Sequence, residues 1–305
     1  MQTLSRRRFL AVTSAACLMS QATAAQAYRW RGVALGAQAT ILLDHPDAEA
    51  LTARAVAEID RLENVFSLYR AQSSLSRLNA EGALAAPDFE LLECLSLAGR
   101  VHDATGGAFD PSVQPLWAAH AEARAQGVAP EAGALERAAA TVGWHRMTFD
   151  TDAIRLAPGQ ALTLNGIAQG YIADKVADLF RAAGVRDVLV DTGEIVALGD
   201  ANGQTGWPVS IQGTGAALRL TGRALATSAV LGTVLDAEGS VGHILDPRTG
   251  QPATGVWAQV SVSAERAAVA DALSTGLVVM ASAEAARAAA AALPGARIES
   301  LIARA

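Results

Sequence analysis

A histidine and an aspartate lie three residues apart in the segment VGHILDPRTG, which spans residues 241–250. Pro247 and Gly250 favour a rigid turn around them. The imidazole of His243 has an ordinary pKa near ~6.5, so it could accept or release a proton close to neutral pH. A single histidine is also often a satisfied structural residue, and Asp246 before a proline is commonly a turn former. The segment alone therefore indicates either a general base or a well-ordered turn.

Three oxygen-bearing side chains share one helical face in the segment ADALSTG, residues 270–276. Asp271, Ser274 and Thr275 are separated by three and four positions, which brings their side chains to the same side of a helix. Carboxylate and hydroxyl oxygens suit a hard cation, and magnesium is favoured if phosphates complete its coordination. The same residues also suit ordinary capping and hydrogen bonding to the helix backbone.

Two glycine-containing segments could bring the backbone close to a ligand. In TLNGIAQGY, residues 163–171, Gly166 and Gly170 stand where a strand gives way to a helix, and a helix amino end favours anions. This segment lacks the order of glycines, lysine and serine found in a phosphate loop, and it does not match a dinucleotide fingerprint. In GGAFDP, residues 106–111, an aromatic ring that could stack on a planar ligand stands beside a carboxylate. Both segments also suit tight packing turns.

These segments need a framework of strands and helices to bring them together. Alternation of apolar residues predicts strands, and apolar positions at helical spacing predict amphipathic helices. The predicted helices cover residues 48–68, 87–104, 130–142, 167–183, 265–280 and 284–293, and the predicted strands cover residues 30–43, 188–190, 207–211, 218–227, 256–262 and 297–302. We expect a fold of the α/β (α+β mixed) class, with mixed sheets and packed helices in one continuous unit over residues 28–305.

Residues 1–27 are predicted to be a signal peptide and not part of the fold. A twin-arginine pattern at residues 5–10 precedes a short apolar stretch and a cleavage triplet ending at Ala27, which indicates export to the periplasm. Without this segment 21 basic and 30 acidic side chains remain, and a net charge of −9 argues against nucleic acid as a partner. No remaining stretch approaches the ~20 apolar residues of a transmembrane segment. Cys94 is the one cysteine left, so no internal disulfide is expected.

Five segments in this order resemble one family, the ApbE-type flavin transferases, which are FAD:protein FMN transferases. The resemblance covers nearly all of the chain after residue 27. It rests on residues 66–79, 107–116, 163–171, 243–250 and 271–275, of which 243–250 is the most specific segment. The fold it implies is a single ApbE-like unit.

The resemblance implies a reaction that depends on Mg²⁺. FAD is cut at its pyrophosphate, FMN passes to a threonine or serine hydroxyl of a target protein, and AMP leaves. By position, His243 is the implied general base. The implied magnesium ligands are Asp271, Thr275, the carbonyl of Gly166 and, as a helper, Ser274. The implied FAD site is lined by Leu35, Tyr69, Ala108, Phe109, Asp110, Thr163, Gln169 and Leu245.

The chain departs from the family pattern at three places. Residues 35–37 read Leu-Gly-Ala where the family commonly has Met-Gly-Thr, so a hydroxyl is missing. Gln169 stands where a lysine is common, and Thr163 stands where many members have an aspartate. The joint loss of a lysine and an aspartate removes an ion pair without leaving either charge unpaired.

A narrower likeness points to the NosX branch of the family. Residues 165–171 and 191–195 resemble that branch, which is associated with flavinylation of the membrane protein NosR in the nitrous oxide respiration apparatus. The implied partner is a NosR-like or related membrane electron-transfer subunit. Two other functions stay open: a periplasmic FAD carrier or scaffold without transfer activity, and a Mg²⁺-dependent FAD pyrophosphatase with water as the acceptor.

Overall fold

The computed structural model describes residues 28–201, 203–215 and 217–304, and the predicted signal peptide lies outside these residues. The helices are α1 (Ala48–Phe66), α2 (Ser74–Glu81), α3 (Phe89–Ala104), α4 (Gln114–Ala125), α5 (Ala132–Ala139), α6 (Ala168–Ala182), α7 (Ala267–Val278) and α8 (Ala283–Ala291). Short 3₁₀ turns cover Pro111–Val113 and Trp144–Arg146. The strands are β1 (Tyr28–Ala34), β2 (Ala37–Leu43), β3 (Ala83–Ala85), β4 (Thr148–Phe149), β5 (Ala153–Arg155), β6 (Val188–Asp191), β7 (Ile195–Leu198), β8 (Trp207–Ser210), β9 (Ala217–Leu220), β10 (Arg223–Ala229), β11 (Leu245–Asp246), β12 (Gln251–Pro252), β13 (Trp257–Ala264) and β14 (Arg297–Ala303).

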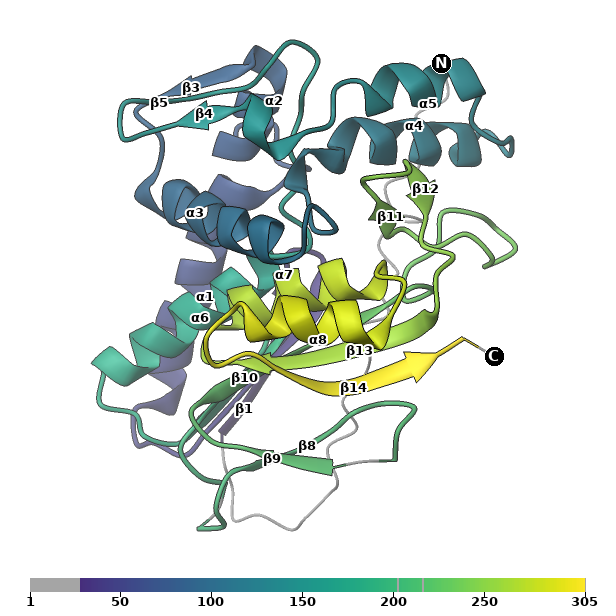
Figure 1. Cartoon of the computed structure of the whole chain (residues 1–305). Coiled ribbons are helices and arrows are strands. Elements are labelled where there is room, and N and C mark those ends of the chain that lie inside the picture. The colour runs from purple at the N-terminus through teal and green to yellow at the C-terminus, as the bar shows by residue number, and fades with distance from the viewer. Residues whose placement is uncertain (1–27, 202, 216, 305) are drawn as a thin grey trace.

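A seven-stranded sheet forms the centre of the fold (Figure 1). Its strand order is β1-β2-β6-β7-β10-β13-β14, and every neighbouring pair runs antiparallel. Side chains alternate between the two faces, so Val188 and Val190 of β6 enter one apolar core and Leu189 enters another. The central strands are apolar at consecutive positions because both faces of the sheet are covered.

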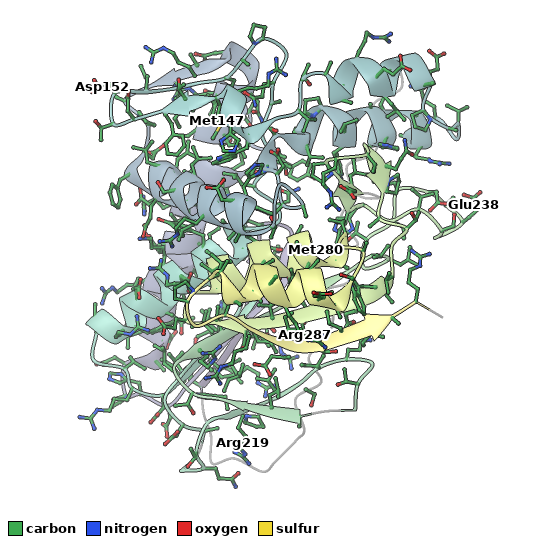
Figure 2. The ribbon with its side chains drawn as sticks, in the orientation of Figure 1. Met147, Asp152, Arg219, Glu238, Met280 and Arg287 are labelled. Atoms are coloured by element: carbon green, nitrogen blue, oxygen red, sulfur yellow. The ribbon has the colours of Figure 1, made fainter. Side chains whose placement is uncertain are left out.

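Helices cover one face of this sheet and a hairpin covers the other. α7 packs on β10 and β13, and α6 packs beside both α7 and α1. On the opposite face, the β8–β9 hairpin buries Trp207, Val209 and Leu220 against the sheet. Charged side chains such as Arg219 of β9 and Glu238 after β10 project away from the body of the protein (Figure 2). No helix in the described residues is long and apolar enough to cross a bilayer.

The predicted mixed class is confirmed, but two predicted strands are each two strands in the structure. Residues 30–43 form β1 and β2, which are joined at Leu35 and Gly36 with φ of 46° and 82°. Residues 218–227 divide at Gly222, whose φ is 61°. The turn at Leu35 and Gly36 reverses the chain into the β1–β2 hairpin, whereas Gly222 marks the passage from β9, which pairs with β8, to β10 in the central sheet. The alternation of apolar residues on either side of each turn continues as if one strand were present.

Two helices were not predicted from the sequence. α2 begins after Ser73, whose side chain accepts a hydrogen bond from the amide of Ser76, and it ends at Gly82 with φ of 74°. α4 has Pro115 in its first turn and lies in an alanine-rich stretch whose helical pattern is weak. This helix contributes a side chain, Trp117, to the cavity described below.

Candidate active site

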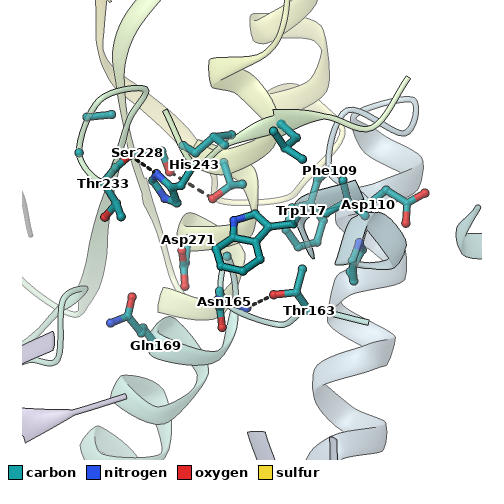
Figure 3. Close-up of a pocket in the computed structure, with 18 of the residues that line it drawn as sticks. Phe109, Asp110, Trp117, Thr163, Asn165, Gln169, Ser228, Thr233, His243 and Asp271 are labelled. Atoms are coloured by element: carbon teal, nitrogen blue, oxygen red, sulfur yellow. Dashed lines mark hydrogen bonds between the residues drawn. The ribbon is translucent and has the colours of Figure 1, made fainter. Parts of the chain in front are cut away.

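One cavity gathers most of the side chains selected from the sequence (Figure 3). Its walls come from the segment before α4, the loop before α6, β10, the loop that leads into β11, and α7. The predicted residues that line it are Ala108, Phe109, Asp110, Thr163, Gly166, Gln169, His243, Leu245, Asp271 and Thr275. Segments far apart in the chain therefore meet at one place.

Three predicted residues do not line this cavity. Leu35 lies in the β1–β2 turn, where its amide donates to Glu63 Oε1 at 2.7 Å. Tyr69 follows α1, and 67% of its surface is exposed. Ser274 is fully buried beneath the cavity wall.

Two closely packed helices hold Asp271 in the cavity wall. A β-carbon added to Gly170 of α6 would lie only 2.4 Å from the carbonyl oxygen of Ala267, so only glycine permits this approach. The amide of Gly170 donates to Asp271 Oδ2 at 3.1 Å. Asp174, one turn further along α6, caps the start of α7 by accepting from the amides of Ala267 at 2.7 Å and Ala268 at 3.0 Å. The cap and the close approach together fix the helix that carries Asp271.

Asp271 and Glu194 make part of the cavity wall acidic. Burial raises the pKa of Asp271 to about 7. Burial, and then the nearby Asp271 charge, raises the pKa of Glu194 well above its usual range. Glu194 Oε2 is buried without a hydrogen-bond partner among the described residues, and no lysine or arginine of the described chain lines the cavity. Buried carboxylates that lack a cationic side chain fit a bound metal ion such as magnesium.

Hydroxyl groups and a glycine surround Thr275. Ser228 Oγ of β10 lies 3.2 Å from Thr275 Oγ1 and 2.8 Å from Ser274 Oγ. Ser274 also donates to the carbonyl of Asp271 at 3.0 Å. A β-carbon on Gly166 would lie 3.0 Å from Thr275 Oγ1, which brings the loop before α6 against α7. Gly166 and Thr275 are therefore in close contact, and Asp271 lies one turn before Thr275 on α7.

His243 has one ring nitrogen engaged with the backbone. Nδ1 lies 3.0 Å from the carbonyl oxygen of Thr233, and a carbonyl only accepts, so Nδ1 carries the proton and Nε2 keeps a lone pair. Burial lowers the pKa of His243 below its ordinary value. The expectation of an unperturbed pKa for this histidine is therefore corrected. The imidazole is therefore neutral at neutral pH and can accept a proton at Nε2.

The aspartate of the same segment supports the turn. Asp246 Oδ1 and Oδ2 accept from Nε and Nη2 of Arg248, each at 2.8 Å. Gly250 has φ of 70°, and its amide donates to the carbonyl of Asp246 at 2.8 Å. His120 of α4 contacts the Gly250 carbonyl through Nε2 at 2.8 Å. These bonds attach the β11–β12 turn to α4 and place the loop that holds His243.

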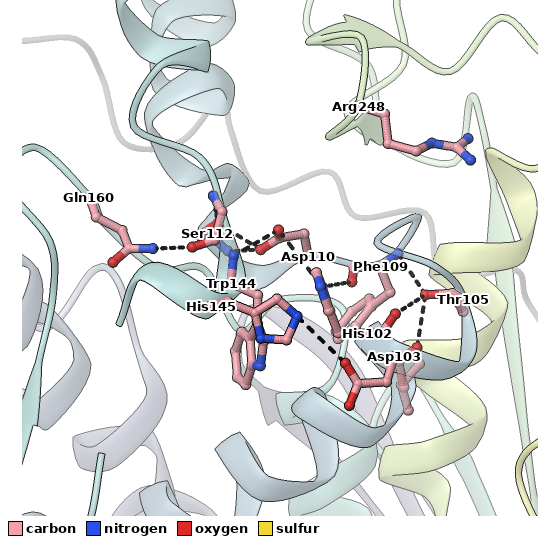
Figure 4. Close-up of polar contacts among 12 residues, drawn as sticks. His102, Asp103, Thr105, Phe109, Asp110, Ser112, Trp144, His145, Gln160 and Arg248 are labelled. Carbon is pink, nitrogen blue, oxygen red and sulfur yellow. Dashed lines mark hydrogen bonds and ion pairs between the residues drawn. The ribbon is translucent and has the colours of Figure 1, made fainter. Parts of the chain in front are cut away.

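Asp110 lines the cavity, but its carboxylate oxygens are already paired with the protein (Figure 4). Oδ1 accepts from the amide of Ser112 at 2.8 Å and its hydroxyl at 2.6 Å, and Oδ2 accepts from the amide of Trp144 at 3.1 Å. His102 Nδ1 donates to the carbonyl of Phe109 at 3.0 Å. This network holds the Phe109 segment at the edge of the cavity.

Two of the three departures from the family pattern, Thr163 and Gln169, face the cavity. Thr163 Oγ1 accepts from the amide of Asn165 at 3.3 Å, and Figure 3 shows this contact at the cavity wall. The side-chain nitrogen of Gln169 lies close to Gly193, where an added β-carbon would be 2.9 Å away. Neither side chain carries a charge, so the cavity has no ion pair between them.

The cavity also contains residues that were not selected from the sequence. Trp117 of α4 adds a large aromatic surface, and Thr233 fixes the tautomer of His243. The sequence could have indicated Glu194, because it lies in the segment 191–195 that resembles the NosX branch. Nothing in the sequence indicated Trp117, because its helix was not predicted. The other lining residues are Pro111, Val113, Asn165, Gly193, Thr227, Ser228, Ala229, Gly232, Ile244 and Pro247.

An acidic wall, a neutral imidazole and aromatic side chains in one cavity define a protein of the mixed α/β class with a candidate binding site for a small planar ligand. The particular family follows from comparison with known proteins. The chain belongs to the ApbE family, which matches residues 35–298.

Two curated relatives and one solved structure show what this chain is similar to. An FAD:protein FMN transferase of Klebsiella pneumoniae is 28% identical over 270 residues, which cover 82% of this chain and 75% of the relative. An FAD:protein FMN transferase of Vibrio cholerae is 30% identical over 242 residues, which cover 73% of this chain and 72% of the relative. The crystal structure of the ApbE protein of Thermotoga maritima aligns with a TM-score of 0.80 and 26% identity, over 90% of this chain and 93% of that one.

Proposed function

We propose that this chain, an FAD:protein FMN transferase of the ApbE family, transfers FMN from FAD to a threonine or serine hydroxyl of a target protein and releases AMP. In this step the bond between the acceptor oxygen and the FMN phosphorus forms while the bond from that phosphorus to the AMP oxygen breaks. Such a reaction requires alignment of the reacting oxygens and stabilisation of negative charge. The observation that carries the proposal is that one cavity holds a free imidazole nitrogen and two buried carboxyl groups, one of which, Glu194, has an oxygen without a hydrogen-bond partner among the described residues.

His243 acts as the general base in this proposal. Its Nε2 accepts the proton of the acceptor hydroxyl, and the carbonyl of Thr233 holds the ring in the tautomer that leaves Nε2 free. The resulting imidazolium is stabilised by the same carbonyl. The lowered pKa keeps the ring neutral before the reaction. A flavin carrier would have no use for a base prepared in this way.

Magnesium is the proposed metal. Asp271, Thr275 and the carbonyl of Gly166 would hold it, and the orphaned carboxylate of Glu194 adds negative charge nearby. When bound, the ion would neutralise negative charge on the diphosphate of FAD. Ser274 would support these ligands without contacting the ion, because its hydroxyl bonds to Ser228 and to the Asp271 carbonyl.

The acceptor is proposed to be a NosR-like membrane electron-transfer subunit. Support for this comes from residues 165–171 and 191–195, whose resemblance is to the NosX branch. Glu194 belongs to the second of these segments and lines the cavity. Comparing flavin incorporation into a NosR domain and into an unrelated flavin-acceptor domain tests the assignment, and equal or better modification of the unrelated domain would contradict it.

The proposed location is the periplasm, reached through the twin-arginine pattern in residues 1–27. Replacing Arg6 and Arg7 by lysine should retain the chain in the cytoplasm, because the twin-arginine route reads the arginine pair itself. Cell fractionation and immunoblotting measure the distribution. Unchanged export of the lysine variant would indicate another route.

Intact mass measurement separates this function from its two competitors. The protein is incubated with FAD, magnesium and the acceptor domain, and both the acceptor and the free nucleotides are analysed. A mass gain of one FMN on the acceptor, with release of AMP, is the expected result. Free FMN without acceptor modification would indicate a pyrophosphatase, and unchanged bound FAD would indicate a carrier.

A further inference from the structure

A second group of metal-ligating side chains lies outside the cavity, where the end of α3 meets the Trp144–Arg146 turn (Figure 4). It consists of His102, Asp103 and His145, whose potential ligand atoms all lie within 4.8 Å of one another. None of the three has a part in the transfer reaction proposed above. We propose that they form a binding site for one divalent transition-metal ion of the zinc class.

His102 is oriented as a metal ligand would be. Its Nδ1 donates to the carbonyl of Phe109 at 3.0 Å, which leaves the lone pair of Nε2 available. Histidines that bind metals typically donate their other ring nitrogen to a carbonyl or carboxylate in this way. The ring also stacks on Trp144, with 5.9 Å between the ring centroids. Its orientation is therefore set before any ion arrives.

Asp103 and His145 can close around an ion with small movements. Their side chains are 68% and 75% exposed, and Asp103 Oδ1 lies 3.8 Å from His145 Nε2. The imidazoles of His102 and His145 have centroids 5.1 Å apart. Ligand atoms around a tetrahedral zinc ion lie about 3.4 Å from one another, given zinc–ligand distances near ~2.1 Å. Rotation of two exposed side chains covers this difference, and water can fill the fourth position.

The backbone that carries His145 is held by buried hydrogen bonds. The amide of Gly143 donates to Ser112 Oγ at 2.7 Å, and Gln160 Nε2 donates to the Gly143 carbonyl at 2.7 Å. The amide of Trp144 donates to Asp110. The turn that carries His145 and the ring of His102 are therefore both held in place before an ion binds. Two imidazoles and one carboxylate favour zinc and similar ions over magnesium, which prefers oxygen ligands.

Calorimetric titration of zinc chloride into the protein tests this site. Saturating FAD and magnesium are present so that the active-site cavity is already filled. We expect one zinc ion per chain. His145→Gln and Asp103→Asn should each weaken zinc affinity roughly tenfold or more, since loss of even an outer partner of a ligand costs this much. His45→Gln, which removes an imidazole far from the cluster in sequence, is the matched control and should keep wild-type affinity.

His145 and Asp103 are chosen for substitution because both side chains are exposed. Circular dichroism verifies that the two variant proteins fold. Cobalt(II) is the second probe, since a tetrahedral site with two histidines produces visible absorption that the His145→Gln variant should lose. Absence of stoichiometric zinc binding in the wild type overturns the proposal. Wild-type affinity in either the His145 or the Asp103 variant overturns it as well.

Discussion

Single hydrogen bonds determine which side chains of the cavity can react. His243 gives Nδ1 to a carbonyl and keeps Nε2 free, whereas the two carboxylate oxygens of Asp246 are both occupied by Arg248. Asp110 and Asp271 both line the cavity, but Asp110 is occupied by Ser112 and Trp144. Asp271 accepts one amide bond and keeps coordination capacity. Residue type alone does not separate the reactive members of these pairs from the structural ones.

Replacement of His243 by alanine should lower the transfer rate by about 10²- to 10⁴-fold, because the acceptor hydroxyl loses its base. The wild-type rate should rise with pH to a plateau, with a midpoint below the ordinary pKa of histidine, since burial lowers the pKa of this imidazole and only its neutral form accepts a proton. Rates from intact mass measurements across pH 5 to 8 provide the check. FAD affinity is the control and should be unchanged. A normal rate in the alanine variant would remove His243 from the mechanism.

Replacement of Trp117 by alanine should weaken FAD binding by roughly tenfold, because the indole ring contributes aromatic surface to the cavity. Trp117→Phe keeps a ring at this position and should retain most of the affinity. Calorimetry with FAD measures both variants. Equal affinity in the wild type and the alanine variant would show that the flavin nucleotide does not reach α4.

At the scale of elements, the contact between α6 and α7 determines where Asp271 and Thr275, the proposed magnesium ligands, lie. Gly170 permits the close approach, and Asp174 satisfies the first amides of α7 from the neighbouring helix. Position 266, where a capping side chain is usual, is occupied by Arg266, which makes no cap bond of its own. The start of α7 is therefore stabilised only when α6 is in place, which couples the two helices.

Gly170→Ala should destabilise the protein by about 2 kcal/mol and weaken metal-dependent transfer, because its β-carbon would collide with the Ala267 carbonyl and separate α6 from α7. Gly133→Ala in α5 is the matched control, since its β-carbon would meet only the flexible end of Arg137 at 3.4 Å. That variant should be neutral or slightly stabilising. Urea unfolding measures both free energies. Similar effects at the two glycines would contradict the importance of this helix contact.

At the scale of the whole molecule, the sheet and its helices bring acidic groups together in a site where no lysine or arginine of the described residues balances them. Asp191 and Glu194 flank the β6–β7 turn, and Asp271 reaches the same region from α7. Burial raises the pKa of all three carboxyls. Their ionisation therefore opposes folding until a cation is bound.

Without divalent cations, stability should fall as pH rises from about 5 to 8. A carboxyl whose pKa is higher in the folded state stabilises the protein below its ordinary pKa, and this contribution is lost as pH passes the folded value, about 7 for Asp271. The shift corresponds to roughly 4 kcal/mol at most for Asp271. Magnesium should restore stability at pH 8 and have little effect at pH 5. Denaturation curves at both pH values measure these changes, and the stability of Asp271→Asn should depend less on pH than that of the wild type. Stability that rises with pH in the absence of divalent cations would contradict this account.

Local patterns in the sequence predicted the mixed fold class, most of the major elements and the segments that meet at the cavity. They succeeded because helical and strand periodicities and turn residues act over a few neighbouring positions, as for residues 48–68 and 188–190. They did not reveal the β1–β2 turn, since Leu35 adopts a left-handed conformation that glycine usually provides. They also missed α4, whose alanine-rich surface carries little pattern.

The sequence by itself therefore determined the chemical groups available to this protein. They are an imidazole, carboxylates, hydroxyls and aromatic rings in an ordered series of segments. Only the tertiary structure decided which of them act together. It placed Trp117 and Glu194 in the cavity, left Leu35, Tyr69 and Ser274 out of its lining, and assigned the free lone pair of His243. The physical reason is that burial, pKa and hydrogen-bond partners depend on atoms brought close by folding, and these atoms belong to residues far apart in the chain.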